Sequence, residues 1–490
     1  MNPVLDLVAI ALLVAATAVL GFAGLRISRT TSDFFVASRS VRPVWNASAI
    51  SGEYLSAGTF LGLAGLVLLS GSEGFWFPIG YAAGYLLVLL FVAAPLRRSG
   101  AYTIPDFIEA RLESMTARRV TSAVVLITGW MYIVPQLHGA AIALGVVADV
   151  PGWVGAVVVA VLVAGIVAAG GMRAVTAVQA MQYWLKLTAL ALPAVLLLVA
   201  LSDGEPSFDP AMVFPQEAGP GGADLYETGS LLLALLLGTI GLPHVLVRFY
   251  TSPDGVAARR TTVLVVGMVG AFYAVSGTMG LLGRVLAPDL ARPGVADTVV
   301  LALPSRVFAG VMGDLLTALV VAGAFAAFLA TSTGLVVSLA GVISQDAFSG
   351  SVRSFRISAA LCTVVPLAIA LLTTPSGLVS SVGAVFVFAA SALTPVLLLG
   401  VWWPRLTARG ATAGMLCGAI SCGGALVASA LIPPEGWAAA LLAQPGAWAI
   451  PLSTTVVVVV SLVDRRGAPA RAERYLARLH LPERRADSTA

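Results

Sequence analysis

The sequence predicts an all-α polytopic membrane protein, and three observations lead to this prediction. Hydrophobic residues make up 59% of the 490 residues, and the mean hydropathy is +0.96. Charged residues make up 11%, whereas an average soluble domain carries about 25%. The apolar residues also gather in runs long enough to cross about 30 Å of hydrocarbon as helices. A soluble globular protein is therefore excluded.

About thirteen apolar runs lie between polar breaks, and we read each as a transmembrane helix. The first run has no basic region before it, so we expect it to remain as a helix and not to be a cleaved signal peptide. The 50 glycines and 27 prolines lie largely inside the runs, which is typical of broken or tightly packed membrane helices. In chain order the runs cover residues 4–25, 44–69, 75–96, 120–148, 153–169, 175–201, 231–247, 262–282, 315–343, 357–372, 378–403, 412–431 and 448–463.

Basic residues predict the orientation, because loops rich in Lys and Arg stay in the cytoplasm. When successive loops alternate in side, one side holds nearly all of the 28 basic residues, Arg248 among them. We therefore expect a multi-pass protein of the inner (plasma) membrane with its N-terminus outside and a short basic cytoplasmic tail at 464–490. The basic residues outside that group are Arg284, Arg292, Arg306 and, within a span, Lys186.

Two of the runs are interrupted by small and polar residues near their middle. The second run contains the stretch from Asn46 to Thr59, and the seventh contains Gly238-Thr-Ile-Gly-Leu-Pro-His244. The two runs are five apart, as an inverted repeat of five helices each requires, and transporters bind their substrate at such paired breaks. Half-helix N-termini suit a carboxylate, and free carbonyls suit a cation. Close helix packing by small residues is the alternative interpretation.

Ionisable residues inside a membrane span are functional candidates, because an unpaired charge there is costly. Glu53 lies in the first break, and Lys186, the sole lysine, lies in the sixth run. These two residues either form a structural ion pair or take part in proton exchange, since a buried lysine readily loses its proton. His244 directly follows the second break and is placed to contact a carboxylate, relay a proton or cap the backbone. For His138 we favour a hydrogen bond to a neighbouring helix.

Several motifs together resemble the solute:sodium symporter family of secondary transporters, over nearly the whole chain. The resemblance implies a leucine-transporter-type 5+5 inverted repeat with extra helices at both ends, within a single transmembrane domain. We expect a peripheral helix at about 4–25, repeats at about 44–201 and 226–403, and C-terminal helices at about 412–463. The motifs are Thr31 to Arg39, Ser51-Gly-Glu-Tyr54, Tyr102 to Phe107, Tyr132 to Gln136, Gly170-Gly-Met172 and Ser344-Gln-Asp346.

Within that family, the second break followed by Arg248-Phe249, Phe388 to Ala392, Trp403 and Arg409-Gly410 resemble the cation/acetate branch. This resemblance implies symport of a short monocarboxylate such as acetate, propionate or pyruvate. The few polar groups at the breaks agree, because each unpaired hydroxyl of a sugar would cost about 1–3 kcal/mol. The candidate substrate-binding residues are Ser51, Glu53, Tyr54, Ser56, Gln136, Gly238, Thr239, Gly241 and His244.

The resemblance also implies a sodium site made from backbone carbonyls of the second run and oxygens of the ninth. The corresponding positions are Ala47, Ile50, Ala327 and Thr331, with Ser332 as a further possible ligand. Ala330 stands where the family usually has a second hydroxyl, so coupling to H⁺ stays open beside coupling to Na⁺. The proton-coupling candidates are Lys186, Glu53 and His244.

Other function classes fit the sequence poorly. No repeated filter loops indicate a channel, and neither the 3 histidines nor Cys362, Cys417 and Cys422 have metal-site or nucleophile spacing. We therefore expect no enzyme and no cofactor apart from the coupling ion. We expect a bilayer but no nucleic acid as partner, and the sequence does not predict the oligomeric state. A sodium/proline or other amino-acid symporter is the alternative function.

Overall fold

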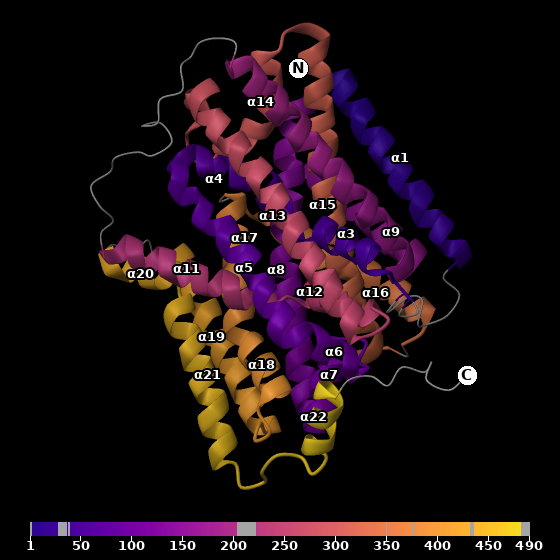
Figure 1. Ribbon diagram of the computed structural model, residues 1–490, viewed down its shortest axis with the longest axis vertical. Coiled ribbons are helices and arrows are strands. Elements are labelled where there is room, and N and C mark those ends of the chain that lie inside the picture. The colour runs from indigo at the N-terminus through magenta and orange to yellow at the C-terminus, as the bar shows by residue number, and fades with distance from the viewer. Residues whose placement is uncertain are drawn as a thin grey trace.

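The structure, a computed structural model, describes residues 2–27, 37, 40–202, 222–348, 350–374, 377–431 and 436–481. Every regular element among them is a helix, which confirms the predicted all-α class. The long helices stand side by side along the long axis of the molecule (Figure 1). The motif Thr31 to Arg39 lies, apart from Ala37, outside the described residues.

The helices pack as one bundle, joined by short 3₁₀ and π-helical segments. In chain order they are α1 (Pro3–Ile27), α3 (Pro43–Tyr54), α4 (Leu63–Ser70), α5 (Trp76–Leu87), α6 (Ala93–Ser99), α7 (Ile104–Leu112), α8 (Met115–Ala148), α9 (Gly152–Ser202), α11 (Gly222–Gly241), α12 (Pro243–Val247), α13 (Gly255–Leu286), α14 (Val299–Val307), α15 (Gly310–Asp346), α16 (Val352–Leu372), α17 (Leu378–Ala392), α18 (Thr394–Trp402), α19 (Ala408–Leu431), α20 (Gly436–Ala443), α21 (Gly446–Val463) and α22 (Ala472–His480).

Eleven helices of the described chain are long and apolar enough to cross a membrane, or up to twelve with the bent pair α17–α18 as one span. The predicted count of about thirteen is not confirmed by this measure. The difference arises at Gly58–Ser99. By this measure the region counts as one continuous helical segment of 42 residues, whereas the sequence predicted parts of two spans there. The chain nevertheless turns within this segment. Gly71 has a φ of 59° after α4, and a Cβ on Gly74 would lie 3.0 Å from the Cα of Val67.

The first predicted break is present between α3 and α4. Leu55, with ψ of 89°, leaves the helical conformation directly after Tyr54. The helix resumes as a π-helical turn, η2 (Gly58–Gly62), that runs into α4. A break inside a membrane span frees backbone groups that need other partners, and the N–H of Ala57 donates to Oε1 of Gln136 at 2.8 Å.

The second predicted break is present between α11 and α12. Leu242 is extended, with φ of −77° and ψ of 117°, and Pro243 opens α12. Proline fits there because the first turn of a helix needs no N–H from it. The two breaks therefore occur where the interruptions in the sequence predict them.

Helix α15 lies at the centre of the bundle and contacts α9, α8, α3 and α1. In its most apolar stretch 89% of the residues are buried inside the protein, compared with 28% in α1. Helices α1 and the pair α19–α21 lie on opposite flanks of the bundle (Figure 1), as expected for extra helices at both ends. The predicted limits of the two repeats, 44–201 and 226–403, stay a prediction.

Two short helices lie outside the predicted spans at the lower end of the molecule (Figure 1). Helix α7 begins with a capping box between Thr103 and Asp106, and Asp106 is 2.9 Å from the guanidinium of Arg118 at the start of α8. Burial raises the pKa of Asp106, although Arg118 opposes this effect. Helix α22 of the tail packs against α7, with the rings of Phe107 and Tyr475 6.2 Å apart. The tail is thus partly helical and docked on the bundle.

Candidate functional site

The two breaks come together deep inside the bundle. Helix α12 contacts α3, α8 and α15, so the second break lies beside the first. The side chains of Ser51, Glu53, Tyr54, Ser56, Gln136, Thr239 and His244 are all at most 1% exposed. This conformation therefore keeps the candidate substrate site closed to solvent.

Tyr54 and Thr239 link the two breaks directly. The Tyr54 hydroxyl lies 3.3 Å from Oγ1 of Thr239 and 3.4 Å from the carbonyl oxygen of Tyr81. The ring of Tyr54 also meets that of Tyr85 edge-on, with centroids 4.6 Å apart. The pair therefore closes the site on the side of α5 and α11.

Gly238 and Gly241 have a packing role in this conformation. A Cβ on Gly238 would lie 2.5 Å from the carbonyl oxygen of Phe386, and one on Gly241 would lie 2.6 Å from that of Ala389. Both glycines therefore let α11 approach α17 closely. Gln136 is likewise engaged with the backbone, because its amide also donates to the Tyr132 carbonyl at 3.3 Å.

His244 and Ser51 present polar atoms without partners at the breaks. In the described chain, neither ring nitrogen of His244 makes a hydrogen bond, and the hydroxyl of Ser51 makes none, whereas the hydroxyl of Ser56 interacts with that of Tyr132. The rings of His244 and Tyr132 meet at 5.1 Å between centroids. Buried polar groups are nearly always paired in folded proteins, so this group is suited to receive a small polar ligand.

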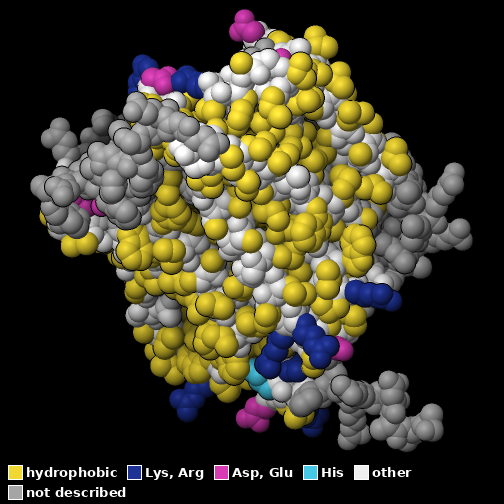
Figure 2. All heavy atoms as spheres, turned by 45° about the horizontal axis from the view of Figure 1, so that its top comes forward, with side chains coloured by type: hydrophobic (Ala, Val, Ile, Leu, Met, Phe, Trp, Pro, Cys, Tyr) yellow, Lys and Arg dark blue, Asp and Glu magenta, His cyan; other side chains and the backbone are white. Residues whose placement is uncertain are grey.

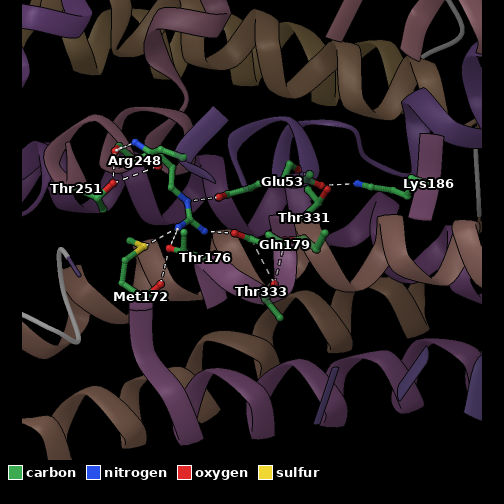
Figure 3. A network of polar contacts seen from close by, with 12 residues as sticks. Glu53, Met172, Thr176, Gln179, Lys186, Arg248, Thr251, Thr331 and Thr333 are labelled. Carbon is green, nitrogen blue, oxygen red and sulfur yellow. Dashed lines mark hydrogen bonds and ion pairs between the residues drawn. The ribbon is translucent and has the colours of Figure 1, made fainter. Parts of the chain in front are cut away.

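Glu53 forms an ion pair with Arg248 and not with Lys186. Nε of Arg248 donates to Oε2 of Glu53 at 2.6 Å, and both side chains are almost completely buried. Figure 3 shows the two side chains pointing at each other from the two broken helices. Gly334 of α15 makes room for the carboxylate, because a Cβ there would lie 1.9 Å from Oε1 of Glu53. The predicted alternative of a Glu53–Lys186 ion pair is therefore wrong for this conformation.

Arg248 was counted above among the basic residues of a cytoplasmic loop, and the structure corrects that assignment. The residue is 0% exposed and follows α12 directly, inside the bundle. Its Nη1 donates to Oγ1 of Thr176 at 2.8 Å, and its Nη2 donates to Oε1 of Gln179. Its carbonyl accepts a hydrogen bond from Asn46 of α3 at 3.3 Å. Arg248 therefore joins α12, α3 and α9, a role that no local sequence signal distinguishes from that of a loop arginine.

Lys186 points to the backbone of the first break. Its ammonium donates to the carbonyl oxygen of Gly52 and, at 2.7 Å, to that of Leu55, as Figure 3 shows beside Thr331. Gly52 lets α9 come this close, because a Cβ there would lie 2.2 Å from the Gln179 carbonyl oxygen. A cation supplied by the chain itself thus binds the free carbonyls of α3.

The candidate sodium ligands are buried between α3 and α15. Ala47, Ile50 and Ala327 are at most 1% exposed, and Oγ1 of Thr331 donates to the Glu53 carbonyl oxygen at 2.6 Å. The hydroxyl of Ser332 makes no hydrogen bond in the described chain. Ala330 contributes its carbonyl oxygen to Nε2 of Gln179 at 2.7 Å. Thr331 is thus beside the first break, as its assignment requires.

His138 lies away from the two breaks. Its Nε2 is 3.2 Å from the carbonyl oxygen of Ala370 and 3.3 Å from Oγ1 of Thr373, both at the end of α16. The hydrogen bond to a neighbouring helix that we favoured for His138 is confirmed.

Replacing Gly334 by alanine is expected to displace Glu53 and lower stability by about 1–3 kcal/mol, the usual effect of overpacking. The measurement is thermal unfolding of the purified protein, together with solute uptake. Gly270 on α13 is the matched control, because a Cβ there meets nothing within 4 Å. Equal stability of Gly334→Ala and Gly270→Ala would show that the Glu53 carboxylate is not held against α15.

Comparison with known proteins identifies the family. Residues 34–418 match the sodium:solute symporter family. The chain belongs to this family. The symporter is therefore a multi-pass membrane transporter of solutes and not an enzyme, as the sequence predicted.

Two curated relatives resemble the symporter over most of both chains. It is 32% identical over 480 residues to the uncharacterized symporter YwcA of Bacillus subtilis (strain 168), covering 92% of this chain and 90% of the relative. It is 30% identical over 521 residues to a monocarboxylic acid transporter of Corynebacterium glutamicum, covering 95% and 92%.

Solved structures share the fold of the symporter at low sequence identity. A Na⁺-coupled sialic acid symporter in a substrate-bound outward-open state matches with a TM-score of 0.73, 15% identity and coverage of 95% of this chain and 98% of that chain. The nucleobase-cation-symport-1 family transporter Mhp1, closed with bromovinylhydantoin bound, matches with a TM-score of 0.58, 15% identity and coverage of 90% and 98%. These likenesses confirm a transporter fold of the leucine-transporter type.

Proposed function

We propose that the symporter imports a short monocarboxylate of the acetate, propionate or pyruvate type by alternating access, coupled to a cation. The observation that supports this proposal most strongly is the pair of residues with unpartnered polar atoms at the breaks, Ser51 and His244. A carboxylate accepts hydrogen bonds from hydroxyl and imidazole donors. The relative from Corynebacterium glutamicum is a monocarboxylic acid transporter, which agrees with this substrate class.

An amino-acid substrate such as proline fits this conformation less well. The ammonium of an amino acid needs an acidic or carbonyl partner in a buried site. Oε2 of Glu53 already pairs with Arg248, and Oε1 of Glu53 lies against α15 at Gly334. The carbonyls of Gly52 and Leu55 already accept from Lys186. The free groups at the breaks therefore favour a substrate without an ammonium.

The geometry favours the proton as the coupling ion. The ammonium of Lys186 lies on two carbonyls of the first break, where it is placed to lose and regain a proton as the helices move. Ala330 offers no hydroxyl to a sodium ion, which leaves Thr331 and Ser332 on α15 beside the carbonyls of Ala47, Ile50 and Ala327. Coupling to a sodium ion bound by these hydroxyl and carbonyl oxygens is the alternative, and it agrees with the family name.

Uptake into proteoliposomes tests substrate and ion together. We expect labelled acetate or pyruvate to accumulate under an imposed pH gradient without sodium, and unlabelled propionate to compete while proline does not. Protein-free vesicles are the control. Accumulation driven by sodium alone would contradict proton coupling, and competition by proline but not propionate would contradict the substrate class.

Replacing Thr331 by alanine separates the two ions further. If the proton is the coupling ion, Thr331→Ala is expected to leave the ion dependence of uptake unchanged. If sodium binds beside Thr331, the variant loses one ligand and needs more sodium for half-maximal uptake. Thr363→Ala on α16 is the control, because that hydroxyl bonds only within its own helix, to Ala360, among the described residues.

The orientation remains part of the proposal, with the N-terminus outside and the C-terminus in the cytoplasm. Removing Arg248 from the count leaves the charge difference between the two sides nearly intact. Arg97, Arg98, Arg118, Arg259 and Arg260 all lie near the ends of their helices. These positions fit the cytoplasmic flank of a membrane protein.

A further inference from the structure

A groove of about 800 Å³ lies on the flank of the molecule between the start of α3 and the first turns of α13. Its walls include Arg42, Val44 and Trp45 on one side and Arg259, Arg260 and Val263 on the other. The groove is separate from the transport site, because the paired breaks lie inside the bundle at the far ends of α3 and α12.

Three arginines give the groove a positive charge. Arg42, Arg259 and Arg260 are all exposed, and none of them has an ion-pair partner within the residues that the structure describes. The nearby carboxylate of Asp254 is used as the helix cap of α13, where it accepts the N–H of Ala257 at 2.6 Å. Among the described residues, the groove therefore carries three cationic side chains without an acidic partner.

The rest of the wall is apolar and exposed. Val44 is 62% exposed, Trp45 58% and Val263 58%. Helix α13 is long and apolar enough to cross a membrane and begins at Gly255. Its 32 residues exceed the roughly 20 that a span needs, so we expect its first turns to lie where the hydrocarbon layer meets the headgroups. Figure 2 shows the hydrophobic surface ending near groups of Lys and Arg towards the ends of the molecule. Trp and Arg are the residues that favour such an interface.

We propose that this groove binds one anionic glycerophospholipid of the surrounding bilayer. The phosphate lies between the guanidinium groups of Arg42, Arg259 and Arg260, since Arg binds phosphate through paired N–H donors. One acyl chain follows the apolar wall past Trp45 and Val263. A phospholipid offers an anion to the three arginines and an acyl chain to the apolar wall. Basic pockets between membrane helices are known to hold acidic headgroups. The lipid joins α3 to α13 and stabilises their packing.

The test uses the purified full-length protein in neutral detergent, titrated with dioleoylphosphatidylglycerol or dioleoylphosphatidylcholine while thermal unfolding is followed. We expect phosphatidylglycerol to stabilise the protein and phosphatidylcholine to do so much less. The variant R42Q/R259Q/R260Q is expected to need a roughly hundredfold higher concentration of phosphatidylglycerol for half of the effect. The control variant R353Q/R465Q/R466Q also removes three exposed arginines and should respond like the wild type.

Two further measurements separate the lipid from other occupants. Phosphatidylglycerol with brominated acyl chains is expected to quench less fluorescence in Trp45→Phe than in the wild type, because the acyl chain contacts Trp45. Stabilisation by water-soluble glycerol phosphate as strong as that by the lipid would show an anion site and overturn the proposal. Equal responses of the two triple variants, or of the wild type to the two lipids, would also overturn it. If R42Q/R259Q/R260Q does not fold, the lysine variant R42K/R259K/R260K replaces it and should retain the preference for phosphatidylglycerol.

Discussion

Replacing Arg248 by glutamine is expected to destabilise the symporter by about 3–5 kcal/mol, because the change leaves Glu53 as a buried carboxylate without its cation. The ion pair is 2.6 Å long and almost completely shielded from water. Removing one partner of such a pair therefore costs far more than the pair itself contributes. The expected readouts are a strong loss of folded protein and a lower temperature of thermal unfolding.

The double variant Glu53→Gln/Arg248→Gln makes this prediction sharper. It removes both charges, so we expect it to be more stable than Arg248→Gln alone, and the difference measures the coupling between the two side chains. The matched control is Arg306→Gln, which breaks an ion pair with Asp289 in which the two side chains are 38% and 51% exposed. An exposed pair contributes about 0–1 kcal/mol. If Arg248→Gln were as mild as Arg306→Gln, the buried pair would not hold α3 and α12 together.

Replacing Lys186 by glutamine is expected to abolish uptake driven by a pH gradient while the protein stays folded. The amide can still donate to the carbonyls of Gly52 and Leu55, but it cannot exchange a proton. The measurement is labelled monocarboxylate uptake under an imposed pH gradient, compared with counterflow exchange under equal pH. We expect exchange to survive better than net uptake, since exchange needs no ion movement.

Lys186→Arg distinguishes a proton carrier from a fixed cation. Arginine keeps the positive charge but does not lose its proton in proteins. We therefore expect Lys186→Arg to lose pH-driven uptake as Lys186→Gln does. Normal proton-driven uptake by folded Lys186→Arg would show that the ammonium only holds the break together, and the same result for Lys186→Gln would remove Lys186 from the mechanism.

The buried ion pair gives the two breaks a mechanical connection. Glu53 lies just before the break in α3, and Arg248 lies just after α12, so the pair joins the two discontinuous helices. Asn46 adds a second link, because its amide donates to the Arg248 carbonyl at 3.3 Å and to Oγ of Ser252 at 3.3 Å. Any movement that separates α3 from the end of α12 must break these contacts together.

Much of the fold follows from patterns that are local in the chain. Long apolar runs with few charges can satisfy their backbone in a bilayer only as helices, so the class and most spans could be predicted. The breaks could be predicted as well, because Gly, Ser and Pro interrupt the runs at matched places. The predicted number of spans differs from the number of long apolar helices. Two spans were predicted where the helical segment Gly58–Ser99 is continuous but contains a tight turn at Gly71.

The pairing of the buried polar groups depends on the tertiary structure alone. The sequence placed Glu53 and Lys186 in spans and Arg248 in a loop, but the choice of partner depends on which helices pack side by side. Gln136 is a similar case, since its contact with the Ala57 N–H joins residues 79 positions apart. Composition and periodicity contain no information about such distances.

The sequence by itself thus determined that this protein is a helical membrane transporter with two interrupted helices. The physical reason is that hydrophobicity and backbone breaks act within one helix. Only the tertiary structure decided that Arg248 neutralises Glu53 and that Lys186 binds the carbonyls of Gly52 and Leu55. Electrostatic pairing acts between helices over a few ångströms, so it is set by the packing of α3, α9 and α12.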